Sequence, residues 1–405
     1  MNLNYVIIRI LFIYLLCSVL NTLSACRLWA VCAKTGFALS TLPSYHKALV
    51  VENLEYYFEQ SKTMPNGWAL LNYDSIPTIP TTSVYRSSIT AYNDSINYWK
   101  QVNTLIDSGQ NRIGIGHLRL ASSGANHIPN PHPWMFYYDD QPYSLVHNGT
   151  ISKSKLYDIL TNNGSDISWL NQNAPKTFNG YSWSSDEGWS SVVDSNLLLL
   201  LIMQSYVENE NLYEAIRLSL TKLLNSGVSA SQINIIMSNG HELYIFGGSS
   251  GLSIMETSAQ VTIMTQPNLN NEVGSYAWSE INNRELIIID KSGISRFPHF
   301  IESSTDNESN PKKIFTLEPA YPNPFNQQIT IPFQIESTGN NARLYIYSII
   351  GEKVFDTALS QNQLNQGFVQ WSPLNNSQMA ISSGPYVVRI ESNKKSLTKK
   401  ILFIK

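Results

Sequence analysis

The chain has 405 residues, with 27 lysines and arginines against 30 aspartates and glutamates, and a formal net charge of −3. Its length suggests two or three domains, and its charge gives no basic surface of the kind that attracts nucleic acid, so we expect no nucleic-acid partner. The 3 cysteines are too few for a disulfide-based scaffold.

Residues 1–25 are typical of a secretory leader. Arg9 precedes the apolar run 10–16, and small residues follow at the end of the segment. The apolar run is shorter than the roughly 20 residues that a membrane-spanning helix needs. We therefore expect 1–25 to be a signal peptide and the mature chain to begin at Cys26, which would then carry both a thiol and a free α-amino group.

The end of this leader leaves alternatives open. Leu23–Cys26 also matches a lipoprotein cleavage box, which would place a lipid on the thiol and acylate the amine. The protein would then be a lipid-anchored, catalytically inactive surface protein.

In a third alternative, Cys32 is the thiol of a cysteine hydrolase and His117 or His147 is its base. We expect no disulfide between Cys26 and Cys32, because an extended strand would separate them by roughly 20 Å.

Residues 26–298 have the pattern of one mixed domain. Strand-like runs such as Arg112–Gly116 alternate with helix-like runs. Two consecutive helices are predicted at Val192–Val207 and Asn211–Asn225, and the spacing of their leucines predicts that one face of each is buried in the core.

Several short motifs of this domain follow one another along the chain. They are Cys26–Ala30, Pro65–Trp68, Gly116–Gly124, His132–Trp134, Leu145–Thr150 and Asp194-Ser195. With these motifs, residues 26–290 resemble the class II glutamine amidotransferases, which are N-terminal-nucleophile hydrolases. The resemblance implies an α+β domain with the four-layer αββα N-terminal-nucleophile hydrolase fold, in which Cys26 begins a central strand. It also implies that Trp278–Ile281 and Leu286–Ile289 form the strand pair that closes the domain.

The resemblance makes Cys26 the catalytic nucleophile. A thiol with an ordinary pKa near 8.5 attacks only as the thiolate, and an α-amino group with a pKa of about 7.7–8.0 is a suitable base for it. Asn148 and Gly149 match the family's oxyanion-binding pair, which donates from a side-chain amide and a backbone N–H. By itself, Asn148-Gly149 is also typical of a turn between a strand and a helix.

Two charged residues match the family's amino-acid pocket. Arg119 would bind the substrate carboxylate through both of its terminal nitrogens, and Asp194 would bind the ammonium. Taken singly, Arg119 is more typical of a surface charge at a strand end, and Asp194 of a helix N-cap. Many family members carry Trp-Ala-Thr-His after this arginine, whereas this chain has Leu120–Ser123. Ser122 keeps the hydroxyl and is also expected to bind substrate.

The composition changes after the first domain. In the predicted linker 299–314, the stretch Glu302–Lys313 is polar, contains a proline and has no large apolar residue. Beyond it, 315–405 alternates apolar and polar residues in short runs separated by turn clusters, which predicts a small β-sandwich.

Four motifs mark this last segment. They are Tyr321–Asn326, Ile346–Val354, Ser383–Tyr386 and Lys399–Lys405. With them, the segment resembles the C-terminal sorting domain of the type IX secretion system. The resemblance implies a small all-β, immunoglobulin-like sandwich that the secretion machinery reads, and a protein that crosses the periplasm to be secreted or held at the cell surface. A carbohydrate-binding sandwich is the alternative, but Trp371 is the only tryptophan of the segment, and a single tryptophan is more typical of a core.

The expected activity is hydrolysis of glutamine or a related small amide, with release of ammonia to water or to an ammonia-accepting partner that the sequence does not identify. We expect no cofactor and no metal. The sequence has neither a phosphate-binding glycine loop nor a dinucleotide fingerprint, and its histidines lack metal-ligand spacing.

Overall fold

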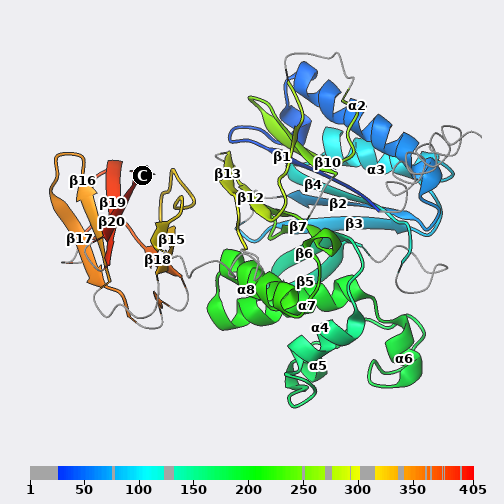
Figure 1. Cartoon of the computed structure of the whole chain (residues 1–405). Coiled ribbons are helices and arrows are strands. Elements are labelled where there is room, and N and C mark those ends of the chain that lie inside the picture. The colour runs from blue at the N-terminus through cyan, green and yellow to red at the C-terminus, as the bar shows by residue number, and fades with distance from the viewer. Residues whose placement is uncertain are drawn as a thin grey trace, which may run out of the picture.

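The computed structural model describes residues 26–74, 78–122, 132–248, 251–269, 276–291, 293–301, 315–335, 342–360, 363–364, 367–375, 377, 379–392 and 395–405. The predicted signal peptide and the polar stretch Glu302–Lys313 lie outside the described residues. Figure 1 shows a mixed α and β domain followed by a smaller all-β module.

The first domain contains a seven-stranded antiparallel sheet with the order β11-β9-β10-β1-β4-β2-β3. Its strands are β1 (Arg27–Ala33), β2 (Trp68–Asp74), β3 (Thr81–Ser87), β4 (Asn111–Leu118), β9 (Leu252–Glu256), β10 (Gln260–Thr265) and β11 (Ser279–Glu280). Strand β1 is the middle strand of this sheet and follows Cys26 directly.

A second antiparallel sheet has the order β13-β12-β8-β7-β6-β5. Its strands are β5 (Trp134–Tyr138), β6 (Gln141–Asn148), β7 (Asn234–Ser238), β8 (Leu243–Gly247), β12 (Glu285–Ile289) and β13 (Ile294–Phe297). The predicted closing pair is therefore wrong as a pair, since β11 joins the first sheet and β12 joins the second. The chain crosses between the two sheets in the few residues that separate these strands.

Helices cover the outer face of each sheet (Figure 1). Helices α2 (Ser44–Gln60) and α3 (Ser95–Asp107) lie on the first sheet, and α4 (Lys153–Leu160), α7 (Asp194–Asn209) and α8 (Leu212–Asn225) lie on the second. The remaining short helices are α5 (Ser168–Gln172), α6 (Asp186–Ser191), η1 (Leu39–Thr41), η2 (Ser61–Thr63) and η3 (Ala230–Gln232). The domain thus has four layers, with two sheets stacked between helices.

Strand β1 is buried on both faces, which explains its almost continuous apolar sequence. Trp29, Val31 and Ala33 pack against the helices α2 and α3. The alternate residues Leu28 and Ala30, with Cys32, pack against the second sheet. This alternation of side chains between the two faces of the sheet follows from strand geometry.

The glycines of β4 allow the helices to approach the first sheet closely. A Cβ added at Gly114 would lie 2.9 Å from Leu105 Cδ2 and 3.2 Å from Trp29, and one at Gly116 would lie 3.1 Å from the Tyr57 ring. These distances are shorter than an ordinary van der Waals contact, so only glycine fits without movement of its neighbours.

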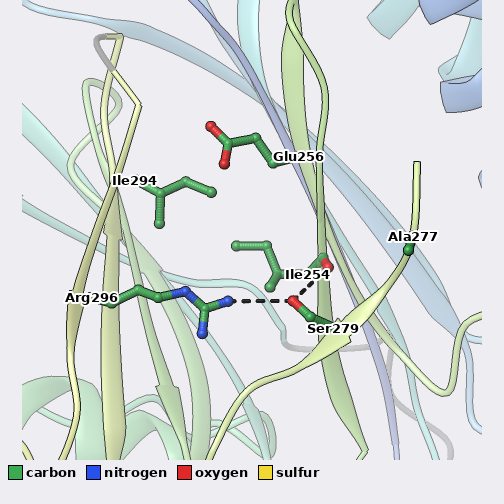
Figure 2. A pocket seen from close by; sticks show the side chains of 6 residues that line it. All are labelled: Ile254, Glu256, Ala277, Ser279, Ile294 and Arg296. Atoms are coloured by element: carbon green, nitrogen blue, oxygen red, sulfur yellow. Dashed lines mark hydrogen bonds between the residues drawn. The ribbon is translucent and has the colours of Figure 1, made fainter. Parts of the chain in front are cut away.

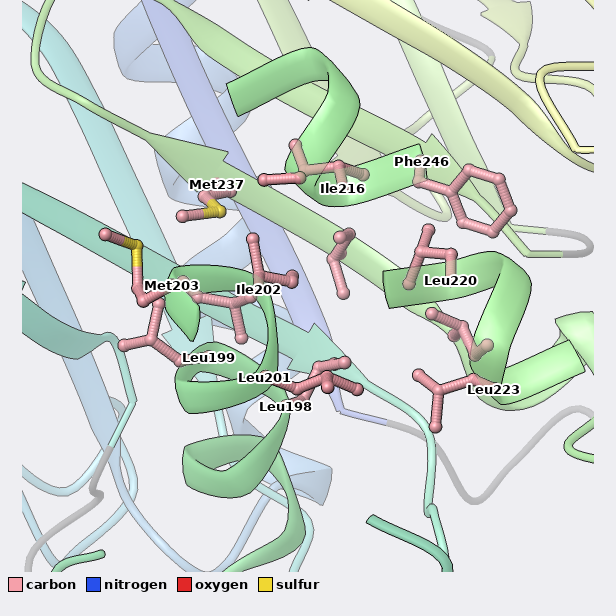
Figure 3. Packing of buried hydrophobic residues seen from close by; sticks show 14 of the residues in the cluster. Leu198, Leu199, Leu201, Ile202, Met203, Ile216, Leu220, Leu223, Met237 and Phe246 are labelled. Carbon is pink, nitrogen blue, oxygen red and sulfur yellow. The ribbon is translucent and has the colours of Figure 1, made fainter. Parts of the chain in front are cut away.

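Helices α7 and α8 form the core beneath the second sheet, as predicted, with boundaries shifted by at most two residues. Helix α7 is apolar on nearly every side because it is enclosed between the sheet, α4 and α8. Figure 3 shows its leucines packed with Ile216, Leu220 and Leu223 of α8 and with Met237 and Phe246 of the sheet.

The C-terminal module has a three-stranded sheet of order β14-β15-β18 and a four-stranded sheet of order β17-β16-β19-β20. The strands are β14 (Phe315–Leu317), β15 (Ile329–Ile335), β16 (Arg343–Ser348), β17 (Lys353–Ala358), β18 (Phe368–Trp371), β19 (Gly384–Ser392) and β20 (Lys395–Phe403). Both sheets contribute to one apolar core that includes Trp371. Across the described part of the chain, no helix has the length and apolar character required to span a membrane.

Candidate active site

Cys26 is half-buried where the chain enters β1, and its sulfur lies against the backbone that follows β4. The Leu120 N–H donates to Sγ and Sγ donates to the Leu120 carbonyl, both at 3.4 Å. Burial raises the pKa of the Cys26 thiol, while the Leu120 backbone and the Arg119 guanidinium act to lower it and Asp194 acts to raise it. Arg119 and Asp194 therefore have opposite effects on the pKa of this thiol.

Arg119 and Asp194 are both buried, each 3% exposed. Arg119 follows β4, and its backbone N–H donates to the Gly67 carbonyl at 2.8 Å. Burial lowers the pKa of Arg119, and the nearby Cys26 acts to raise it. The alternative that Arg119 is a surface charge at a strand end is therefore wrong.

Asp194 is the first residue of α7 rather than its N-cap, which is Val193. Its Oδ2 accepts the Ile151 N–H at 2.8 Å, so the carboxylate binds a neighbouring loop instead of capping its own helix. A negative charge here is favoured by the N-terminal end of the helix dipole.

Asn148 ends β6, and Gly149 begins the loop that leads to α4. A Cβ at Gly149 would lie 2.0 Å from the Gln232 carbonyl oxygen and 2.9 Å from His147 Nε2, so the backbone here passes too close to its neighbours for any other residue. Ser122 is exposed, and its Oγ accepts the Thr150 hydroxyl at 2.7 Å. This bond joins the loop after β4 to the loop after β6.

These residues meet around a cavity of about 20 Å³, room for about one water molecule. Its lining residues are Cys26, Arg119, Leu120, Ala121, Ser122, His132, His147, Gly149, Val193, Asp194 and Ser195. Five of the six residues singled out from the sequence are among them. The sixth, Asn148, stands next to Gly149 but is not among the described residues that line the cavity.

The sequence interpretation missed a buried hydrogen-bond chain beside this cavity. His132 Nδ1 lies 2.8 Å from His117 Nε2, and His132 Nε2 lies 2.5 Å from Ser195 Oγ, which also accepts the Trp134 Nε1–H at 3.1 Å. Burial lowers the pKa of His132 well below its ordinary value, and the neighbouring His117 lowers it further. Only the motif His132–Trp134 could have indicated this chain, since the contacts depend on tertiary structure.

The alternative in which Cys32 is the catalytic thiol is wrong. Cys32 is fully buried between the sheets, its Sγ donates to the Ala33 carbonyl, and Arg112 Nη1 donates to that sulfur at 3.3 Å. The two histidines proposed as its base have other hydrogen-bond partners, since His117 is bonded to His132 and His147 Nε2 donates to the Gln232 carbonyl at 2.8 Å. Both Cys26 and Cys32 are free thiols.

A larger cavity of about 400 Å³ opens where the edges of the two sheets separate. Figure 2 shows Glu256 and Arg296 on its walls, with Arg296 directed toward Ser279. Glu256 is paired with Lys34 and Arg296 with Glu285, so both charges are already compensated. None of the described residues that line it is a cysteine or a histidine, whereas the smaller cavity is lined by Cys26, His132 and His147. The smaller cavity is therefore the candidate active site.

Residues 319–405 match the family model of the secretion system C-terminal sorting domain. The C-terminal module is thus a sorting domain of type IX secretion, and the protein is secreted or located at the cell surface. The surface component PorZ of that system, from Porphyromonas gingivalis, is similar over 30% of this chain and 15% of that chain, with 18% identity and a TM-score of 0.18.

The chain also has structural similarity to glutamine amidotransferases. The glutamine phosphoribosylpyrophosphate amidotransferase from B. subtilis matches with 15% identity and a TM-score of 0.42, over 67% of this chain and 48% of that chain. A predicted glutamine amidotransferase from Pseudomonas aeruginosa matches with 12% identity and a TM-score of 0.32, over 67% and 98%. The chain therefore spans about half the length of the first of these structures. A search of the curated proteins found no match.

Proposed function

We propose that the first domain is an exported amidohydrolase of the N-terminal-nucleophile class, with Cys26 as nucleophile and glutamine or a related small amide as substrate. The observation that carries this proposal is the meeting of Cys26, Arg119, Gly149 and Asp194 at one cavity, although they come from four separate parts of the chain. Their order and type resemble those of class II glutamine amidotransferases.

The two buried charges suit an amino acid. Arg119 offers a guanidinium that can bind both oxygens of an α-carboxylate, and Asp194 offers a carboxylate for the α-ammonium. Both line the same cavity as Cys26. Because the cavity has room for only about one water molecule, glutamine could enter between these charges only if the residues around the cavity move apart, and its side-chain amide would then lie near Sγ.

In the proposed reaction the mature chain begins at Cys26, and its α-amine takes the thiol proton, directly or through a water molecule. Sγ then attacks the amide carbon, and the oxyanion is stabilised by donors at Asn148 and Gly149. The C–N bond breaks, and the protonated amine returns its proton to the departing ammonia. Water hydrolyses the resulting thioester, which yields the carboxylic acid and restores the thiol.

The direct test is to incubate the mature protein with glutamine and a set of related amides and to measure released ammonia. Cys26→Ser should reduce turnover by at least about a hundredfold, because a serine hydroxyl is a far weaker nucleophile at neutral pH. Asp194→Ala should raise KM more than it lowers kcat, because it removes binding of the substrate ammonium.

Cys32→Ser is the matched control, since it makes the same substitution at a buried thiol far from the cavity, and it should retain turnover. Ammonia release that survives Cys26→Ser would contradict the mechanism. Activity on other amides with none on glutamine would leave the mechanism in place and change the substrate.

A further inference from the structure

Among the described residues, Tyr321 of the motif Tyr321–Asn326 places its side chain in the core of the first domain. Its backbone belongs to the sorting domain, because it exchanges two hydrogen bonds with Thr330 of β15, at 2.9 and 2.7 Å. Its ring belongs to the other domain, because it is 6% exposed and packs within the apolar core beneath the second sheet.

An aromatic cluster of the first domain receives this ring. The Tyr321 centroid lies 4.9 Å from that of Tyr213 in α8 and 5.5 Å from that of Phe297 in β13. Tyr213 also packs against Phe300 at 5.0 Å. Aromatic ring pairs at these distances contribute a stabilising free energy in addition to the one that comes from burying apolar area.

Other residues support the same contact. A Cβ added at Gly367, which precedes β18, would lie 3.8 Å from Arg217 Nη2 on α8. The carboxylate of Glu318 acts to raise the pKa of Tyr213. The three-stranded sheet of the sorting domain thus faces α8, and the four-stranded sheet lies on the far side, as Figure 1 shows.

The Tyr321 hydroxyl is buried and has no hydrogen-bond partner among the described residues. A buried hydroxyl without a partner opposes docking, so the favourable contribution comes from the ring alone. This separates the role of the ring from that of the hydroxyl.

We propose that Tyr321 is an anchor that docks the sorting domain onto α8 and β13 of the first domain, so that the two domains move as one rigid body. The proposal is independent of the chemistry at Cys26. It makes the polar stretch Glu302–Lys313 a connection between docked domains rather than the only link between them.

Small-angle X-ray scattering of the full chain tests the anchor. The unaltered protein should scatter as one compact body. Tyr321→Ala should increase the maximum dimension, on the order of 10 Å, because the sorting domain would then be held only by the polar stretch. Tyr321→Phe should scatter like the unaltered protein, because it keeps the ring and removes only the unpaired hydroxyl.

Tyr347→Ala, on the four-stranded sheet, is the matched control and should leave the scattering unchanged. If Tyr321→Ala unfolds the sorting domain, which circular dichroism would show, Tyr213→Leu weakens the same contact from the first domain and should produce the same increase. Scattering from the unaltered protein that already requires two independently moving bodies would overturn the proposal, as would unchanged dimensions in both Tyr321→Ala and Tyr213→Leu.

Discussion

At the level of single residues, the reactivity of Cys26 is set by groups of opposite sign. Burial raises the pKa of its thiol, Arg119 acts to lower it, and Asp194 acts to raise it. At neutral pH the thiolate is therefore a minor species, and its fraction depends on which neighbour is present. Removal of each neighbour should change the fraction in a predictable direction.

We expect Arg119→Gln to slow alkylation of Cys26 by iodoacetamide at pH 7.5, because loss of the cation raises the thiol pKa further. Asp194→Asn should accelerate it, because loss of the anion lowers that pKa. Each change should be about two- to tenfold, since a tenfold change in thiolate corresponds to one pKa unit. Mass spectrometry of the labelled protein gives both rates.

Cys32→Ser in each background ensures that only Cys26 is labelled. Equal rates in the two variants, or changes in the reverse order, would contradict the electrostatic arrangement around the sulfur. Both variants also remove a residue of the proposed substrate pocket, so the alkylation rate is informative only in the absence of substrate.

At the level of secondary structure elements, His132 connects β4 to the start of α7. Its ring is bonded to His117 on one side and Ser195 on the other. Burial lowers its pKa well below the ordinary value, so it stays neutral in the folded protein, whereas in the unfolded chain it gains a proton near pH 6.5. Its contribution to stability is therefore complete above about pH 6.5 and is lost as the pH falls below that value.

We expect His132→Gln to lower the free energy of unfolding at pH 8 by about 1–3 kcal/mol, because the partners of the ring lose their hydrogen bonds. Between pH 7 and pH 5 the variant should lose less stability than the unaltered protein, by at most about 1.4 kcal/mol per pH unit. Urea unfolding at several pH values measures both effects. Equal pH slopes for His132→Gln and the unaltered protein would exclude the titration argument.

Strand β4 gives a second prediction at this scale. Gly114→Ala should lower the free energy of unfolding by about 1–3 kcal/mol, because the new methyl group would be forced against Leu105 and Trp29. Ser83→Ala on the edge strand β3, at an exposed position, should stay within about 0.5 kcal/mol of the unaltered protein. Similar urea midpoints for the two variants would mean that the helix layer yields without cost.

Local sequence patterns predicted the helices and strands of this chain better than they predicted which strands pair with one another. The leucine spacing predicted α7 and α8, and the alternating runs predicted the strands of the sorting domain. The run Trp278–Ile281 has a strand pattern, but only the tertiary structure determines that β11 joins the first sheet while β12 joins the second. The same limit applies to the site, where the motifs indicated Arg119 and Asp194 but the bridge through His132 depends on residues far apart in the sequence.

At the scale of the whole molecule, processing at Cys26 decides between the proposed enzyme and the lipid-anchored alternative. We expect intact-mass measurement and N-terminal sequencing of the exported protein to show an unmodified Cys26 as the first residue. The proposed mechanism requires this, because a lipid would occupy the thiol and an acyl group would remove the base. An added diacylglyceryl mass would establish the anchor and exclude the amidohydrolase.

Export depends on the other end of the molecule. A chain truncated before β14, which lacks the sorting domain, should accumulate in the periplasm, because nothing remains for the type IX machinery to recognise. Cell fractionation and immunoblotting measure the distribution, and Cys26→Ser, which keeps the sorting domain, should reach the surface or the medium like the unaltered protein. The truncation also uncovers the cluster of Tyr213 and Phe297 that the Tyr321 ring buries, so its free energy of unfolding should fall by about 1.5–3 kcal/mol, the amount expected for exposing a large apolar side chain. Truncated protein found outside the cell at the level of Cys26→Ser would show that the sorting domain is not the export signal of this chain.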